Sequence, residues 1–122
     1  MSDSAVEQAP IPSDPEDLKL ITLARAALGR TGAQQGAAVR DTDGRAYAAA
    51  SIDLEHLKLS GIGVAVAMAV SSGAVGLEAV ALVGDVEPSD ADLNIVADLA
   101  GHSTVIIWAA SGGAVKSVTT LT

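Results

Sequence analysis

The side chains best suited to nucleophilic chemistry lie together in the middle of the chain. Asp53, Glu55 and His56 occur within four residues, and Ser60 follows His56 by four. On a helix this spacing puts His56 and Ser60 on one face, where an imidazole could activate a hydroxyl. The nucleophile elbow G-x-S-x-G of many serine hydrolases is absent from the sequence. We therefore do not assign a Ser-His-acid hydrolase to these residues.

The same segment offers an imidazole and two carboxylates as metal ligands. Zinc sites are usually built from Cys and His side chains, and the chain has no cysteine. Without thiols it can form neither a disulfide nor a thiolate nucleophile. We interpret Asp53, Glu55 and His56 as a solvated polar loop and predict no catalytic residue and no metal site there.

A long uncharged stretch, LSGIGVAVAMAVSSG (residues 59–73), comes next. It is long enough to cross a bilayer, but Gly, Ala and Ser add little hydrophobicity, and no cluster of basic residues flanks it. Its G-x-G at 61–63 has neither a third glycine nor a strand leading directly into it, so a nucleotide-binding turn is not predicted. An apolar helix buried on all sides fits best.

Composition and net charge limit which kinds of partner the chain can bind. The chain has 122 residues, of which 49% are hydrophobic, enough for one domain with one core. Its formal net charge of -8 repels phosphate backbones and anionic lipid, so we predict no nucleic-acid and no membrane partner. The acidic start and the lack of cysteine lead us to expect a cytoplasmic protein without a secretory signal.

The elements that must position these residues alternate along the chain. Residues 1–13 are predicted to be a disordered tail. Residues 14–122 are predicted to form a single domain with helices over 15–28, 56–72 and 89–100 and strands over 36–40, 45–52, 77–84, 104–109 and 114–121. Gly29 is the expected end of the first helix, and Ser89 with Asp92 has capping-box spacing for the third. This order predicts a three-layer α/β domain around one sheet.

The order of the predicted elements and the local sequence patterns resemble those of the cytidine deaminase family. GAAVR, DTDG and YAAASIDLE resemble the family's hairpin and its acidic ribose-binding segment. LSGIGVAVAMAVSSG resembles the helix that opens with Cys-Ala-Glu-Arg, and PSDAD (residues 88–92) stands where the family has Pro-Cys-x-x-Cys. The resemblance covers residues 18–110 and implies a cytidine deaminase-like α/β/α sandwich with a mixed central sheet.

The resemblance also implies a zinc-bound water that attacks cytosine and a Glu that moves protons. Here Ser60 stands at the first ligand, Ile62 at the Glu, and Ser89 and Asp92 at the Cys pair. A hydroxyl that stays protonated is a poor zinc ligand, and Ile cannot carry a proton. The four positions are therefore interpreted as a vestigial site, with no cofactor expected although the family uses zinc.

Three hypotheses follow from the resemblance. The first is a pseudoenzyme that binds an unknown protein partner or a ligand, or acts only as an oligomeric scaffold. We expect a homo-dimer or homo-tetramer because the second predicted helix is too apolar for one of its sides to face water. The second is a cytidine deaminase-type hydrolase with a rebuilt site using His56 or Asp92. The third is a nucleoside-binding protein in which Asp53, Glu55 or His56 contacts the ligand, with Asp53 or Glu55 on the ribose hydroxyls.

Overall fold

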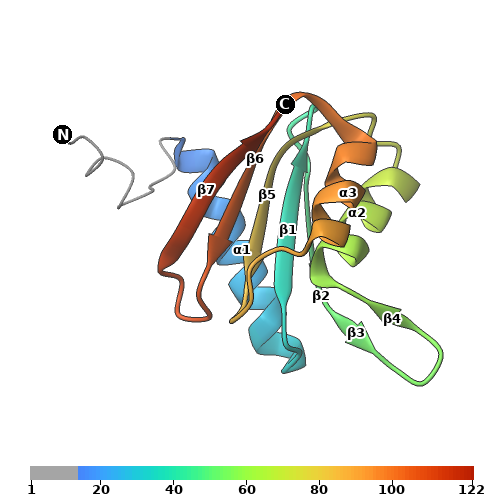
Figure 1. Cartoon of the computed structure of the whole chain (residues 1–122), viewed down its shortest axis with the longest axis vertical. Coiled ribbons are helices and arrows are strands. Elements are labelled where there is room, and N and C mark those ends of the chain that lie inside the picture. Colours follow the sequence, from blue (N-terminus) through green and yellow to red (C-terminus); the bar gives the residue numbers. More distant parts are fainter. Residues whose placement is uncertain (1–13) are drawn as a thin grey trace.

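The first helix, α1 (Pro15–Thr31), begins where the sequence predicts and ends later (Figure 1). The computed structural model describes residues 14–122, except for the side chains of residues 101 and 102, so the predicted tail 1–13 lies outside the described residues. Asp14 caps α1 by accepting a hydrogen bond from the Glu16 N–H at 2.9 Å. The expected end at Gly29 is wrong, because the helix stops only where Gly32 turns left-handed, with φ of 66°.

One five-stranded sheet forms the middle layer. Its order is β2 (Ala46–Ala50), β1 (Gly36–Asp41), β5 (Leu77–Val83), β6 (Ala100–Ala109) and β7 (Val115–Leu121). β5 and β6 run parallel, and the other three neighbouring pairs are antiparallel. The two parallel strands are joined by a crossover that contains a helix, the usual connection for a parallel pair. The prediction of a mixed central sheet is confirmed.

Helices cover both faces of the sheet. α1 lies on one face, and α2 (Gly61–Ser71) and α3 (Asp90–Leu99) lie on the other (Figure 1). Alternate strand residues face the two helical layers, so there is a core on each side. The predicted three-layer α/β/α sandwich is therefore confirmed. Among the described residues, no helix is long and apolar enough to cross a membrane.

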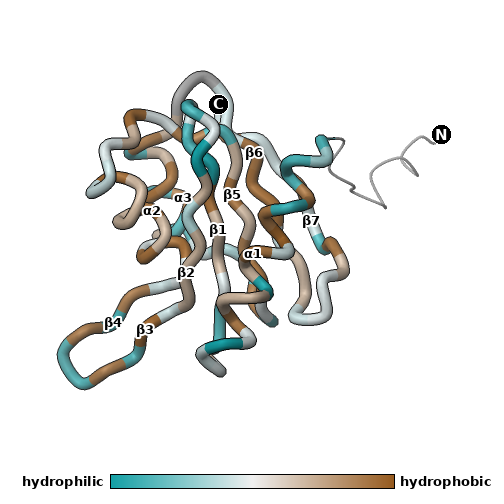
Figure 2. The backbone as a smooth tube through the Cα atoms, turned by 180° about the vertical axis from the view of Figure 1, so that it is seen from behind, coloured by the Kyte–Doolittle hydropathy of each residue, from teal (hydrophilic) through white to brown (hydrophobic). Residues whose placement is uncertain are grey.

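The segment before α2 departs from the sequence prediction. Residues 56–60 were expected to start the second helix, but β3 (Ile52–Asp53) and β4 (Lys58–Leu59) pair as a small hairpin, and the helix begins at Gly61. The alternation of Leu57, Lys58 and Leu59 has the period of a strand. This hairpin projects from the body of the domain, and both of its strands carry hydrophobic residues (Figure 2).

Candidate functional site

Ser60 lies at the N-terminal cap of α2. Its Oγ accepts a hydrogen bond from the Gly63 N–H at 3.0 Å. The Gly61 N–H donates to Oε1 of Gln35 at 2.9 Å. Two of the N–H groups that a helix start leaves without helical partners are therefore satisfied by side chains of this chain. Ser60 acts here as a cap: its hydroxyl oxygen accepts one backbone N–H, which leaves its O–H to donate elsewhere.

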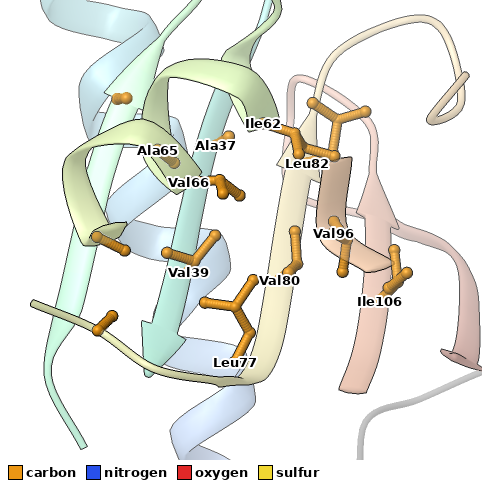
Figure 3. Close-up of a cluster of buried hydrophobic side chains, with 13 residues drawn as sticks. Ala37, Val39, Ile62, Ala65, Val66, Leu77, Val80, Leu82, Val96 and Ile106 are labelled. Atoms are coloured by element: carbon orange, nitrogen blue, oxygen red, sulfur yellow. The ribbon is translucent and has the colours of Figure 1, made fainter. Parts of the chain in front are cut away.

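Ile62 points from the first turn of α2 into the core. Its side chain is 0% exposed and belongs to the cluster that α2 and α3 form with the sheet. Figure 3 shows it directed toward Leu82 of β5, with Val96 of α3 lower in the same cluster. An aliphatic side chain in this place can neither donate nor accept a proton.

Ser89 and Asp92 form a complete capping box at the start of α3. Oγ of Ser89 accepts from the Asp92 N–H at 3.0 Å, and Oδ2 of Asp92 accepts from the Ser89 N–H at 3.3 Å. The capping role predicted from their spacing is confirmed. Asp92 is only 3% exposed, so its carboxylate lies within the protein and is engaged with the helix start.

The structure brings Ser60, Ile62, Ser89 and Asp92 to one end of the strands of the sheet. α2 and α3 pack against each other on the same face, and a Cβ at Gly63 would lie 3.8 Å from Cδ1 of Ile95. α3 follows the carboxyl end of β5, while α2 begins beside Gln35, just before β1. Since β1 and β5 are antiparallel, the start of β1 lies beside the end of β5, and both helices begin at this end of the sheet. In open α/β sheets, ligands bind outside the carboxyl ends of the strands.

These residues do not fit the zinc that the resemblance implies. Ser60 and Ser89 are neutral hydroxyls that accept backbone hydrogen bonds, and Asp92 is one carboxylate used as a cap. Tetrahedral zinc sites need three or four Cys, His or carboxylate ligands. Across residues 14–100 and 103–122, no three His, Cys, Asp or Glu side chains gather in a way that could hold a metal ion.

A groove of about 640 Å³ opens beside the starts of β1 and α2. Gln35, Ser51, Asp53 and Ser60 are among the residues that line it, so the structure places Asp53 and Ser60 on one groove. The Asp53 side chain is 83% exposed and pairs with Nζ of Lys58 at 3.1 Å. The groove therefore has neutral hydrogen-bonding groups along its wall and a solvated ion pair at the hairpin.

Glu55 and His56 do not line this groove. They lie between the two strands of the projecting hairpin, with side chains 86% and 89% exposed and 3.4 Å between Oε2 of Glu55 and Nε2 of His56. Because residue 56 lies in this hairpin, the expectation that a helix puts His56 on one face with Ser60 is wrong.

Sequence reasoning missed Gln35 and Ser51. The Gln35 N–H donates to Oγ of Ser51 at 3.1 Å, and the Ser51 N–H donates to the Gln35 carbonyl at 2.9 Å. With the bond to Gly61, these contacts join the starts of β1 and α2 to the end of β2. A single glutamine in a loop follows no motif, and only its position beside two other elements gives it this role.

Comparisons with known proteins agree with this fold. A sequence model described as cytidine deaminase-like matches residues 13–113. The chain resembles a cytidine deaminase structure from Burkholderia pseudomallei, with a TM-score of 0.73, 22% identity and coverage of 83% of this chain and 89% of that one. Cytidine deaminase structures from Mycobacterium leprae (0.66, 19%, covering 84% and 90%) and Mycobacterium tuberculosis (0.63, 23%, covering 72% and 80%) are also similar. No curated protein sequence matches significantly.

Proposed function

The chain belongs to the cytidine deaminase-like family, and from this premise we propose that it does not carry out zinc-dependent deamination but acts as an oligomeric binding or scaffold protein. The burial of Ile62 carries the proposal. Zinc deaminases need a Glu that moves protons between the metal-bound water and the base. The fully buried aliphatic side chain at the corresponding position cannot do this. The cysteine-free chain is consistent with the cytoplasm, and that location is part of the proposal.

Deamination by the purified protein tests this proposal. Cytidine, deoxycytidine and cytosine are incubated with the protein in the presence and absence of added zinc, and uracil-containing products are measured by chromatography. We expect no turnover above a protein-free control. Turnover that scales with protein concentration would overturn the proposal. Turnover that Asp92→Asn or His56→Ala abolishes would assign it to a rebuilt site.

A nucleoside-binding role is favoured by the groove beside Ser60. Its amide and hydroxyl groups on Gln35, Ser51 and Ser60 suit an uncharged polar ligand, and Asp53 can accept hydrogen bonds from vicinal hydroxyls. Titration calorimetry with cytidine and uridine tests this role. We expect binding that Asp53→Asn weakens, whereas Glu55→Gln, away from the groove, leaves it unchanged. Absence of heat up to millimolar ligand would discard the role.

The outer face of α2 favours assembly into a homo-oligomer. No charged residue occurs between Lys58 and Glu78, and Met68 and Val70, one on each side of the buried stripe of α2, are 39% and 52% exposed. A second copy could cover this face without bringing like charges together, although each chain carries -8. Light scattering after gel filtration measures the assembly, and Met68→Glu is expected to reduce the mass. Asp98→Asn, on α3, serves as a control.

A further inference from the structure

Gln35, which lines the groove, is fixed by both its main chain and its side chain. Its N–H donates to Oγ of Ser51 at 3.1 Å, and its carbonyl accepts from the Ser51 N–H at 2.9 Å. Its Oε1 accepts from the Gly61 N–H at 2.9 Å. A Cβ at Gly84, just after β5, would lie 3.7 Å from Cγ of Gln35, so the backbone there borders this side chain. The terminal amide therefore has one defined position beside the start of α2.

The bond to Gly61 decides how the amide of Gln35 is turned. A backbone N–H can only donate, so the group that faces it must be the acceptor Oε1, and the NH₂ group faces away from that N–H. Nε2 has no hydrogen-bond partner among the described residues, and it is not buried. In the described part of the chain, Nη1 of Arg40 is the one buried side-chain nitrogen or oxygen without a partner. The N–H groups of Nε2 are therefore open to a ligand.

This free amide belongs to the groove beside Ser60. Gln35 also borders a second hollow next to the end of α1, but Ser60 lines only the groove, and the amide is tied to Gly61, the next residue. The Ser60 hydroxyl accepts from the Gly63 N–H, and its O–H remains to donate. A hydroxyl can also accept, but an amide NH₂ cannot. Gln35 therefore requires a hydrogen-bond acceptor on the ligand at this end of the groove.

Asp53 sets the direction in which a nucleoside would lie. It follows Ser51 by two residues of extended chain, which places it roughly 7 Å farther along the hairpin. Its carboxylate is the group proposed above to accept from vicinal hydroxyls, so the ribose lies at the hairpin. In a pyrimidine nucleoside the ribose is attached to N1, and C4 lies directly across the ring from N1. The substituent on C4 then points toward Gln35 and Ser60.

We infer that Nε2 of Gln35 recognises the C4 substituent of a pyrimidine nucleoside and makes the groove prefer uridine to cytidine. This inference rests on the nucleoside-binding role proposed above. The C4 oxygen of uridine has lone pairs for the Gln35 N–H and the Ser60 O–H. The C4 amino group of cytidine is a donor that would face the donor of Gln35, which leaves both without a partner. The groove then suits the compound that deamination of cytidine yields better than cytidine itself.

Titration calorimetry with uridine and cytidine tests this preference. We expect uridine to bind at least about tenfold more tightly, because cytidine leaves desolvated donors unpaired. In Gln35→Glu, one carboxylate oxygen can still accept from the Gly61 N–H, while the other puts an acceptor in the place of Nε2. We expect this variant to prefer cytidine. Gln34→Glu adds the same charge to a neighbouring residue of the groove and should keep the preference for uridine.

Two further measurements separate recognition from stability. Thermal unfolding of Gln35→Glu should stay close to that of the parent, because the bond to Gly61 is kept and a negative charge near a helix start is favourable. The side-chain amide resonances of Gln35, taken from the assigned spectrum of the parent protein, report on Nε2 directly. We expect uridine to shift these resonances and cytidine, at the same saturation, to shift them less.

The outcomes distinguish the role of Gln35 from nucleoside binding itself. Equal affinities, tighter binding of cytidine by the parent, or a Gln35→Glu variant that still prefers uridine would overturn the role of Gln35. Amide resonances that do not move when uridine binds would overturn it as well, even if the variant fails to fold. Absence of heat with both nucleosides up to millimolar ligand would discard the nucleoside-binding role, and the preference with it.

Discussion

Gln35 holds the start of α2 through one hydrogen bond, in which its Oε1 accepts from the Gly61 N–H at 2.9 Å. Gly61 also lies close to β1, because a Cβ there would be 3.3 Å from the Cβ of Ala37. We expect Gln35→Ala to lower the free energy of unfolding by about 1 kcal/mol, since it leaves a helix-start N–H without its partner. Urea unfolding measures the change. Gln34→Ala, at an exposed neighbour, should stay within about 0.5 kcal/mol of the parent.

The burial of Ile62 predicts that an acid is not tolerated there. Ile62→Glu would put an ionisable group, without a partner, among the aliphatic side chains of the α2–α3 core. We expect a loss of about 3 kcal/mol or more at neutral pH. Ile62→Val, which removes one methylene, should cost about 1 kcal/mol. Both values come from denaturant unfolding. Equal stability of the two variants would mean that position 62 reaches water or a cation.

The sequence predicted the fold well because its strong patterns are local. The alternation of apolar and polar residues in strands, the capping box at Ser89 and the uncharged run after Lys58 can each be recognised within a short continuous segment. The hairpin at 52–59 was partly missed, because apolar residues at 57 and 59 fit a short strand and a helix start equally well. The groove could not be predicted, since Gln35, Ser51 and Asp53 meet only when β1, β2 and the hairpin are placed in space.

The ionisation of Asp41 makes the stability of the fold depend on pH. Its side chain is 1% exposed, and burial works to raise its pKa, but hydrogen bonds from the Arg45 N–H, the Tyr47 hydroxyl and the Asp43 N–H outweigh this and hold the pKa below its usual value. A carboxyl whose pKa is lower in the folded chain stabilises the fold above the unfolded pKa of about 3.9. That stabilisation is lost as the pH falls through the folded value.

Asp41→Asn tests this dependence. At pH 7 we expect the variant to be less stable by about 1–3 kcal/mol, because an amide is a weaker acceptor than a carboxylate. The difference should narrow as the pH falls below about 4, where the parent carboxyl becomes protonated. Thermal unfolding over a pH series measures it. Asp43→Asn is the control, since that side chain is 62% exposed and should matter little. A difference that does not change with pH would contradict the role of the charge.

The positions of Ser60, Ser89 and Asp92 predict that a zinc site can be rebuilt. All three lie at the starts of two adjacent helices, where each now caps the backbone. The triple variant Ser60→Cys/Ser89→Cys/Asp92→Cys replaces these caps by thiolates, which bind zinc far better than hydroxyls. We expect one zinc per chain that survives dialysis, counted by native mass spectrometry. Lost capping should cost the metal-free variant about 1 kcal/mol for each helix.

The control moves one thiol to the far end of the same helix. Ser71→Cys/Ser89→Cys/Asp92→Cys keeps the number of thiols but places one at the last residue of α2, about 16 Å along the helix from position 60. This variant should retain no zinc after dialysis. If both variants bind zinc equally, two cysteines at α3 suffice and position 60 does not converge with them. If neither binds, the helix starts do not meet as the resemblance to zinc deaminases requires, and the assignment of the vestigial site is wrong.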